Sequence, residues 1–175
     1  MKNLALIPLL FVLIACQSKK NETEKSYMVE NTELSAAKTE KEDLKFKSTG
    51  IQTIYSAYAS LRDALVETDF ETAKKYAQQL SIALESESKM QEAGIASNIF
   101  SAGEIEIARR HFYELNEGME AILEGNIESG KINKCYCPMA LDNKGASWFS
   151  TKDEINNPYF GDKMLKCGVI KKTLE

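Results

Sequence analysis

Residues 101–126 read SAGEIEIARRHFYELNEGMEAILEGN, and this stretch predicts the longest helix of the chain. Ser101 and Glu104 have the spacing of a capping box at its start, and Gly125-Asn126 is a stop signal at its end. The apolar residues between them recur in three- and four-residue steps, which places their side chains on one helical face: Ile105, Ala108, Phe112, Leu115, Met119 and Ile122. We therefore expect a mainly α protein.

Two similar stripes precede this segment. Residues 51–65 and 70–84 each carry apolar side chains at three- and four-residue steps, and Thr68 with Glu71 forms a second capping-box pattern between them. Residues 90–100 are ambiguous, since Gly94 and Ser97-Asn98 weaken a helix there. Short connections favour antiparallel neighbours, so the sequence predicts an antiparallel bundle of three or four helices.

The helical period disappears after Gly130. Residues 132–140 alternate loosely, Asp142-Asn143-Lys144-Gly145 is a strong turn signal, and Trp148 lies in the apolar run that follows. We expect an irregular hairpin packed against the bundle, with Trp148 as its anchor. Thr151 to Glu154 predict one more turn of helix, which would end before Pro158.

The N-terminus has the pattern of a secretory signal. A basic start at Lys2 precedes an apolar run from Leu4 to Ile14 that is too short to span a bilayer comfortably. Leu13-Ile14-Ala15-Cys16 is similar to the bacterial lipobox; the alternative is an ordinary signal peptide with a chance cysteine. We expect a signal peptide over 1–15, lipidation at Cys16, a polar tether over 16–49 and one domain over 50–175.

Such a protein would cross the inner membrane and be held in the cell envelope by its lipid, most simply on the outer membrane. The formal charge of −4 comes without a basic stripe, which argues against nucleic acid as a partner. No phosphate-binding loop, haem motif or nucleophile set stands out, so we expect no enzyme. His111 is the only histidine, one position off the apolar stripe, and such a residue is more often structural than a ligand.

The C-terminal third concentrates sulfur. Cys135, Cys137 and Met139 lie in one block, and Met164 and Cys167 in another. Thiolate and thioether are the soft ligands that Cu(I) prefers, so these residues are candidate ligands, with Cys135 as an alternative. Zinc fits less well, because Cys-x-Cys is not its usual spacing.

The same residues allow a different interpretation. In an oxidising envelope Cys137 and Cys167 could form a structural disulfide, and Met139 and Met164 would then fill the core. The protein would be a scaffold that binds another envelope protein. With Cys16 acylated, three thiols remain, so one cannot pair within the chain, and a thiol–disulfide role is a third alternative.

Four ordered blocks give a resemblance. They are Cys137-Pro138-Met139-Ala140, Gly145-Ala146-x-Trp148-Phe149-Ser150, Glu154-Ile155-x-Asn157-Pro158-Tyr159-Phe160-Gly161 and Met164-Leu165-x-Cys167-Gly168. Together they resemble a bacterial lipoprotein domain of unknown function that is also similar to the C-terminal domain of some periplasmic adaptor subunits of heavy-metal efflux pumps.

This resemblance spans roughly residues 51–174. It implies a helical envelope domain linked to copper or similar metals, with an efflux system or another envelope protein as the partner. The candidate ligands that it carries over are Cys137, Met139, Met164 and Cys167, whereas Cys135 lies outside its pattern. The residues expected to shape the segment are Trp148, Asn157, Pro158, Tyr159 and Gly161.

Overall fold

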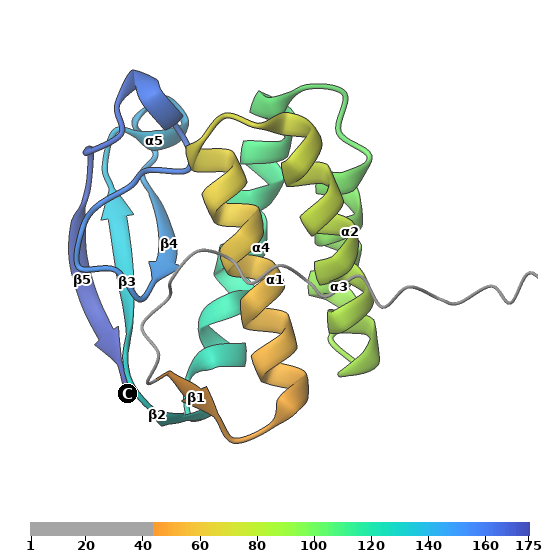
Figure 1. Ribbon diagram of the computed structural model, residues 1–175. Helices are drawn as coiled ribbons and strands as arrows, with labels where there is room; N and C mark the ends of the chain where they lie inside the picture. Colours follow the sequence, from red (N-terminus) through yellow and green to blue (C-terminus); the bar gives the residue numbers. More distant parts are fainter. Residues whose placement is uncertain (1–43) are drawn as a thin grey trace, which may run out of the picture. The chain divides into compact units, whose positions relative to one another are not determined.

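The computed structural model describes residues 44–175. The expected signal peptide, the lipidation site Cys16 and nearly all of the expected tether lie outside the described residues. Within the described part, a helical region is followed by an antiparallel sheet (Figure 1), which confirms a mostly helical protein with a strand-containing C-terminal segment. None of the helices described in residues 44–175 is long and apolar enough to cross a membrane.

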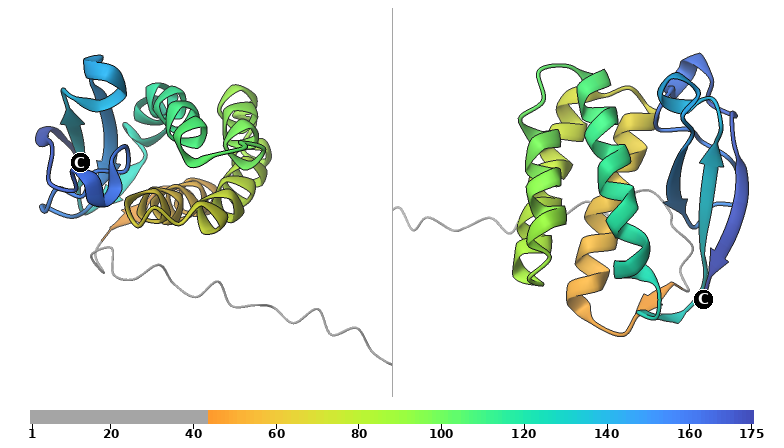
Figure 2. Two further views of the ribbon diagram at one scale, coloured as in Figure 1. Left: turned by 90° about the horizontal axis from the view of Figure 1, so that it is seen from above. Right: turned by 180° about the vertical axis from the view of Figure 1, so that it is seen from behind.

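The helical region consists of α1 (Thr49–Val66), α2 (Phe70–Ser86), α3 (Met90–Phe100) and α4 (Ile105–Leu123). Consecutive helices run in alternating directions and pack on one another (Figure 1). Seen from above, α1 and α4 are next to the sheet, and α2 and α3 are farther from it (Figure 2). The adjacent antiparallel packing expected from the short connections is therefore present.

The predicted apolar stripes form the interior of the helical region. Most of their residues are fully or almost fully buried, as the three- and four-residue spacing requires: Ile51, Ile54, Tyr58, Leu61, Leu65, Ala73, Ala77, Leu80, Leu84, Ala108, Phe112, Leu115, Met119 and Ile122. Phe70 and Ile105, the first residues of α2 and α4, are only partly buried. The ambiguous segment is also helical. Its buried residues Ala93 and Ala96 are small, and the Ser81 hydroxyl of α2 donates a 2.9 Å hydrogen bond to the Ala93 carbonyl. Tertiary contacts thus offset the weak helix propensity there.

Both predicted capping boxes in the helical region are misplaced. The N-cap of α2 is Asp69, whose carboxylate accepts from the Thr72 amide, and the N-cap of α4 is Glu104 without a side-chain bond. Thr68 instead directs its hydroxyl to Asp162, 94 residues away, at 2.9 Å. The Ser101 hydroxyl returns to the Ser97 carbonyl at the end of α3. Because these two hydroxyls are bonded to groups outside the capping-box pattern, they do not cap α2 and α4.

A short two-stranded ladder joins the segment before α1 to the segment after α4. β1 (Lys45–Phe46) pairs antiparallel with β2 (Ile127–Ser129). Phe46 is buried and its ring lies 5.3 Å from that of Tyr55. Residues 45 and 46, expected within the tether, therefore belong to the packed part of the chain.

The C-terminal sheet has the order β4-β3-β5, with both pairs antiparallel. β3 (Ile132–Cys137) and β4 (Ala146–Ser150) form the predicted hairpin, and Cys135 lies opposite Trp148. β5 (Val169–Leu174) was not predicted, because its residues are exposed up to Leu174 and show no alternation. The predicted helical turn at 151–154 is wrong: that segment is irregular, and the Lys152 amide bonds back to the Ser150 hydroxyl at 3.0 Å.

A buried polar network joins the sheet to α1 and α4. The Tyr58 hydroxyl accepts from the Phe149 amide at 2.9 Å and donates to the Asn116 side chain at 2.6 Å. The Asn116 amide group donates to the Tyr159 hydroxyl at 3.2 Å, and that hydroxyl donates to the Ser147 carbonyl at 2.6 Å. Burial raises the pKa of both tyrosines well above the ordinary value, so the network is neutral and hydrogen-bonded.

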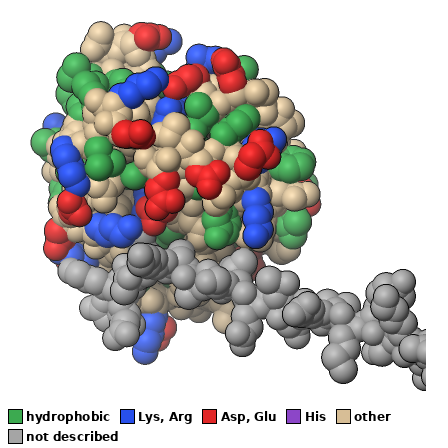
Figure 3. All heavy atoms as spheres, turned by 45° about the horizontal axis from the view of Figure 1, so that its top comes forward, with side chains coloured by type: hydrophobic (Ala, Val, Ile, Leu, Met, Phe, Trp, Pro, Cys, Tyr) green, Lys and Arg blue, Asp and Glu red, His purple; other side chains and the backbone are tan. Residues whose placement is uncertain are grey.

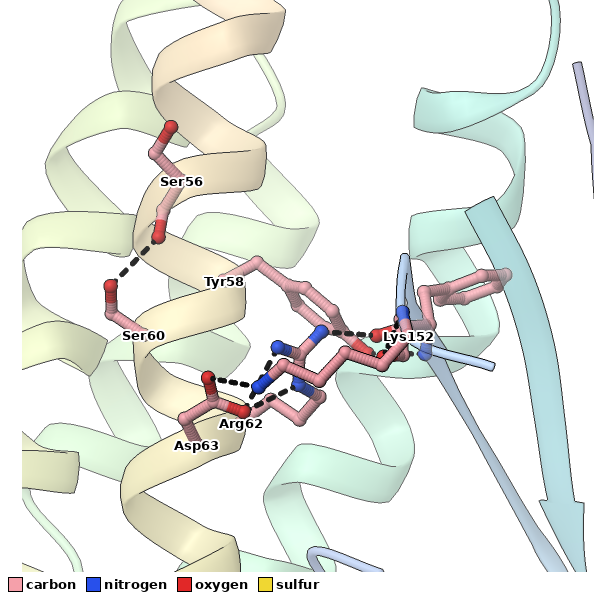
Figure 4. Close-up of polar contacts among 8 residues, drawn as sticks. Ser56, Tyr58, Ser60, Arg62, Asp63 and Lys152 are labelled. Carbon is pink, nitrogen blue, oxygen red and sulfur yellow. Dashed lines mark hydrogen bonds and ion pairs between the residues drawn. The ribbon is translucent and has the colours of Figure 1, made fainter. Parts of the chain in front are cut away.

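Two buried arginines, Arg62 and Arg109, also bond across the boundary between the helices and the C-terminal part. We call this boundary, with its buried polar residues Tyr58, Asn116 and Tyr159 and the two arginines, the seam. Arg62 donates to the Phe149 carbonyl at 2.8 Å and binds Asp63, which Lys152 also reaches (Figure 4). Arg109 donates to the carbonyls of Pro158 and Leu65 at 2.9 and 3.0 Å. Arg62 therefore bonds α1 to β4, and Arg109 bonds α4 both to α1 and to the segment after β4.

Candidate functional site

The sheet register brings Cys137 and Cys167 together. Cys137 ends β3, and Cys167 precedes β5 in the turn that leads into that strand. Tyr136 pairs with Val169 in the β3–β5 ladder, so continuing the antiparallel register places Cys137 opposite Gly168, the residue next to Cys167. Their sulfur atoms are 2.6 Å apart, although 30 residues separate them in the chain.

This sulfur pair sits at the edge of the core. Cys137 is fully buried, whereas Cys167 is partly accessible to solvent. The hydrogen bond shared with Cys137, together with partial burial, raises the pKa of Cys167 above its ordinary value. The pair could release two protons to solvent and bind a soft cation through its thiolates, or transfer two protons and two electrons to a disulfide oxidant.

The two methionines approach this pair through their backbone. The Met139 amide forms a hydrogen bond to the Cys167 sulfur, and its side chain is 48% exposed. The Cys167 amide donates to the Met164 carbonyl at 3.1 Å, which closes a tight turn between these two residues. Met139 and Met164 therefore belong to the two segments that carry the cysteines, each linked to Cys167 through its backbone.

Cys135 lies deeper. It is fully buried on the same side of β3 as Cys137, two residues along the strand. Its thiol contacts the Asn133 carbonyl at 3.9 Å, and burial raises its pKa to about 11, with the nearby Arg62 opposing that shift. A neutral, enclosed thiol of this kind is poorly suited to exchange chemistry.

Asn157 holds the Cys167 turn in place. Its side chain is completely buried, donates to the Cys167 carbonyl at 2.7 Å and accepts from the Tyr159 amide at 2.8 Å. Its own amide donates to the Leu165 carbonyl at 2.8 Å. One residue therefore fixes both ends of the segment that presents Cys167, which fits the shaping role expected for Asn157.

The other residues expected to shape the segment also have defined contacts. Trp148 is buried, and a Cβ on Gly168 would come within 2.7 Å of its ring, so the turn beside Cys167 packs closely on the indole. Pro158 supplies a carbonyl and Tyr159 a hydroxyl to the seam. Gly161 has a φ of +56° beside Arg109, a conformation that favours glycine.

His111 is remote from this chemistry. Its Nδ1 lies 2.9 Å from a carboxylate oxygen of Glu114, one turn along the same helix. Within residues 44–175, no three side chains from among His, Cys, Asp and Glu come together as a metal-ligand group.

Three residues of the seam were not predicted from the sequence to have a structural role. Arg62, Arg109 and Asn116 are buried polar side chains that join helices to the C-terminal part. Each follows an apolar stripe residue by four positions, for example Arg62 after Tyr58, so each points into the interior. A polar residue on an apolar stripe was the signal available for finding them.

A family model described as a protein of unknown function, DUF3347, matches residues 54–130. A DUF3347 domain is therefore present, which agrees with the expected domain of unknown function. The matched range covers most of the helical region and ends before β3, so it contains none of the five sulfur residues. No curated protein and no solved structure matches the chain at a significant level.

Proposed function

We propose that this protein is a lipid-anchored module of the bacterial envelope that binds a soft metal ion, Cu(I), without acting as an enzyme. Cys137 and Cys167 would supply thiolates, with Met139 and Met164 as thioether ligands. The observation that carries the proposal is the convergence of the two cysteine sulfurs at 2.6 Å from segments 30 residues apart. An efflux system or another envelope protein would be the partner that delivers or receives the metal.

The donor set and its position support this proposal. Two sulfur ligands beside two nearby methionines match the preference of Cu(I) for thiolate and thioether. Cys167 and Met139 are accessible to solvent, so an incoming ion has a route to the pair. A bound cation would favour the thiolates and offset the raised pKa of Cys167.

A Cu(I) competition titration against a chromophoric chelator tests the proposal on the reduced full chain under anaerobic conditions. We expect one equivalent of Cu(I) to bind, and Cys137→Ser or Cys167→Ser to weaken binding by at least roughly a hundredfold, because each removes one thiolate. Cys135→Ser is the matched control and should bind as tightly as the unmodified chain. If all three variants bound Cu(I) as tightly as the unmodified chain, copper binding by Cys137 and Cys167 would be ruled out.

A second candidate is a scaffold in which Cys137 and Cys167 form a disulfide and the protein presents its surface to another envelope protein. The sulfur separation favours it specifically, since 2.6 Å is well inside ordinary nonbonded contact and close to the ~2.05 Å of an S–S bond. Oxidation would transfer two electrons and two protons from the thiols to a disulfide-containing oxidant.

Intact-mass analysis with and without reductant separates the candidates. A disulfide predicts a difference of about 2 Da that maps to Cys137 and Cys167 after alkylation. It also predicts a loss of roughly 3–4 kcal/mol of stability on reduction, as expected for a closed loop of this length. Thiols that remain reduced after purification from aerated envelope extracts and retain copper would favour the metal-binding candidate.

A further inference from the structure

A cleft of about 480 Å³ lies beside the seam, apart from the sulfur pair. Its walls come from three segments: the first turns of α4, the turn at Leu141 to Lys144, and the stretch from Tyr159 to Lys163. A volume of this size is typical of sites that bind small molecules. Because three separate segments converge on it, the cleft is a product of the tertiary structure.

The interior of the cleft offers apolar contact. Tyr113, Leu141 and Phe160 line it, and each is only partly buried against the core. The hydroxyl group of Tyr159 is already bonded to the Ser147 carbonyl, so this ring contributes mainly its apolar surface. An apolar or aromatic body would gain free energy by covering these side chains.

Some of the charged side chains around the cleft form ion pairs, and others do not. Glu106 binds Arg109 at 2.9 Å and lies 3.8 Å from Lys163, and Glu114 binds His111. In contrast, Arg110 and Lys144 are exposed and have no ion-pair partner among residues 44–175.

One acidic residue of the lining, Asp142, is also unpaired within the described residues. The unpaired groups therefore comprise two cations and one anion, and the cleft keeps an excess of positive charge. On the face that Figure 3 shows, acidic and basic side chains are otherwise interspersed. The local excess at this cleft selects for an acidic group on its ligand.

One wall of the cleft is also strained. Leu141, Asp142 and Asn143 have φ values of +52°, +58° and +65° in succession. Asp and Asn tolerate this left-handed conformation, but for leucine it costs on the order of 1–2 kcal/mol. The contacts around this turn must offset that cost, and backbone strain of this kind is often found at ligand-binding segments.

We propose that this cleft binds a small amphipathic anion. The ligand would have an apolar or aromatic body against Tyr113, Leu141 and Phe160, and one carboxylate, sulfonate or phosphate group between Arg110 and Lys144. The site uses none of the candidate metal ligands, so it stands independently of copper binding.

The probe for the test is 8-anilinonaphthalene-1-sulfonate, an aromatic anion whose fluorescence rises in apolar surroundings. We expect saturable binding to the folded full chain. Arg110→Ala and Lys144→Ala should each weaken it about five- to tenfold, because each removes a charged hydrogen-bond donor. Lys75→Ala, an exposed lysine on α2 that does not line the cleft, is the matched control.

Two competitors identify the natural source of the anion. Displacement by monomeric dodecanoate supports a free amphipathic acid, and displacement by phosphatidylglycerol vesicles, but not by phosphatidylcholine vesicles, supports a lipid headgroup. The proposal is overturned if Arg110→Ala and Lys144→Ala bind the probe as well as the unmodified chain, or if Lys75→Ala weakens binding equally. Unchanged thermal unfolding of the variants confirms that the probe reports the cleft and not a loosened core.

Discussion

The helical region and the C-terminal sheet are held by different kinds of contact. Inside the helical region, apolar side chains are buried along regular stripes, as with Leu80 of α2 and Leu115 of α4. At the seam, buried polar groups meet instead. Arg62, Arg109 and Tyr58 form hydrogen bonds with backbone groups of the C-terminal part, and the Asn116 side chain bonds to the hydroxyls of Tyr58 and Tyr159.

This difference bears on specificity. Apolar contacts are non-directional and tolerate small shifts, whereas a buried hydrogen bond is lost when its partner moves by an ångström. The polar seam therefore fixes the orientation of the sheet, and with it the positions of Cys167 and Asn157. The helical region supplies stability, and the seam supplies the geometry on which a site depends.

The largest expected effect comes from removing the sheet's aromatic anchor. Trp148→Ala should destabilise the protein by about 3–5 kcal/mol, because it leaves a large cavity under β3 and β5. If the two regions fold as one unit, helical circular dichroism and near-UV signals will unfold together in urea. A helix signal that keeps its midpoint in this variant would show that the sheet is an independent addition.

Two adjacent arginines test the seam directly. Arg109→Ala should cost roughly 2–4 kcal/mol, since the carbonyls of Leu65 and Pro158 would lose their buried donor. Arg110→Ala, on the exposed side of the same turn, should change stability by less than about 0.5 kcal/mol. Chemical denaturation of both variants gives the comparison, and equal losses would contradict a structural role specific to Arg109.

High pH should weaken the seam before the helical interior. Burial raises the folded-state pKa of Tyr58 and Tyr159 above the ordinary 10.0. Above about pH 10 the unfolded chain releases these protons and the folded chain keeps them, so stability is complete below that pH and falls above it.

The slope should approach about 1.4 kcal/mol per pH unit for each buried tyrosine, measured by urea midpoints between pH 9 and 11. Tyr58→Phe should make this slope shallower while lowering stability at pH 7, since the Phe149 amide loses its acceptor. An unchanged slope in that variant would exclude Tyr58 as a source of the alkaline loss.

The smallest expected effect concerns ion pairs at the edge of the seam. Lys134 and Lys172 of the sheet hydrogen-bond to Glu120 of α4 and hold the pKa of its carboxyl below the ordinary 4.5. Their contribution is therefore present above about pH 4.5 and is lost as the pH falls through the lower folded-state value. Glu120→Gln should cost about 0.5–1 kcal/mol at pH 7 in low salt and less in 0.5 M salt. A cost that does not depend on salt would point to packing instead.

The helical region could be predicted because its information is local. The stripes from Ile51 to Leu65 and from Ile105 to Ile122 define buried faces whatever lies opposite them. The first residues of α2 and α4 were predicted less well than the helical faces. The hydroxyls of Thr68 and Ser101, expected to cap these helices, form hydrogen bonds elsewhere. The β3–β4 hairpin was also within reach, because the turn signal at residues 142–145 and the flanking strands are adjacent in sequence.

The candidate site could be predicted only in composition. The residue types at Cys137, Met139, Met164 and Cys167 pointed to sulfur chemistry, and Asn157 was expected to shape the segment. Nothing local indicated β5, whose pairing with β3 brings Cys167 to Cys137. The resemblance set Cys135 apart from Cys137, but only the structure shows the neighbours of these two buried thiols: the Cys137 sulfur lies beside that of Cys167, and the Cys135 thiol contacts the Asn133 carbonyl.

By itself, the sequence determined the mainly α class, the helical faces and the crowding of sulfur in the last third of the chain, because each is written in residue types and short-range spacing. Only the tertiary structure decided which thiols meet, how the sheet is oriented on α1 and α4, and where a cleft forms. Those features depend on contacts across 30 to 90 residues, which are selected by register and by buried hydrogen bonds.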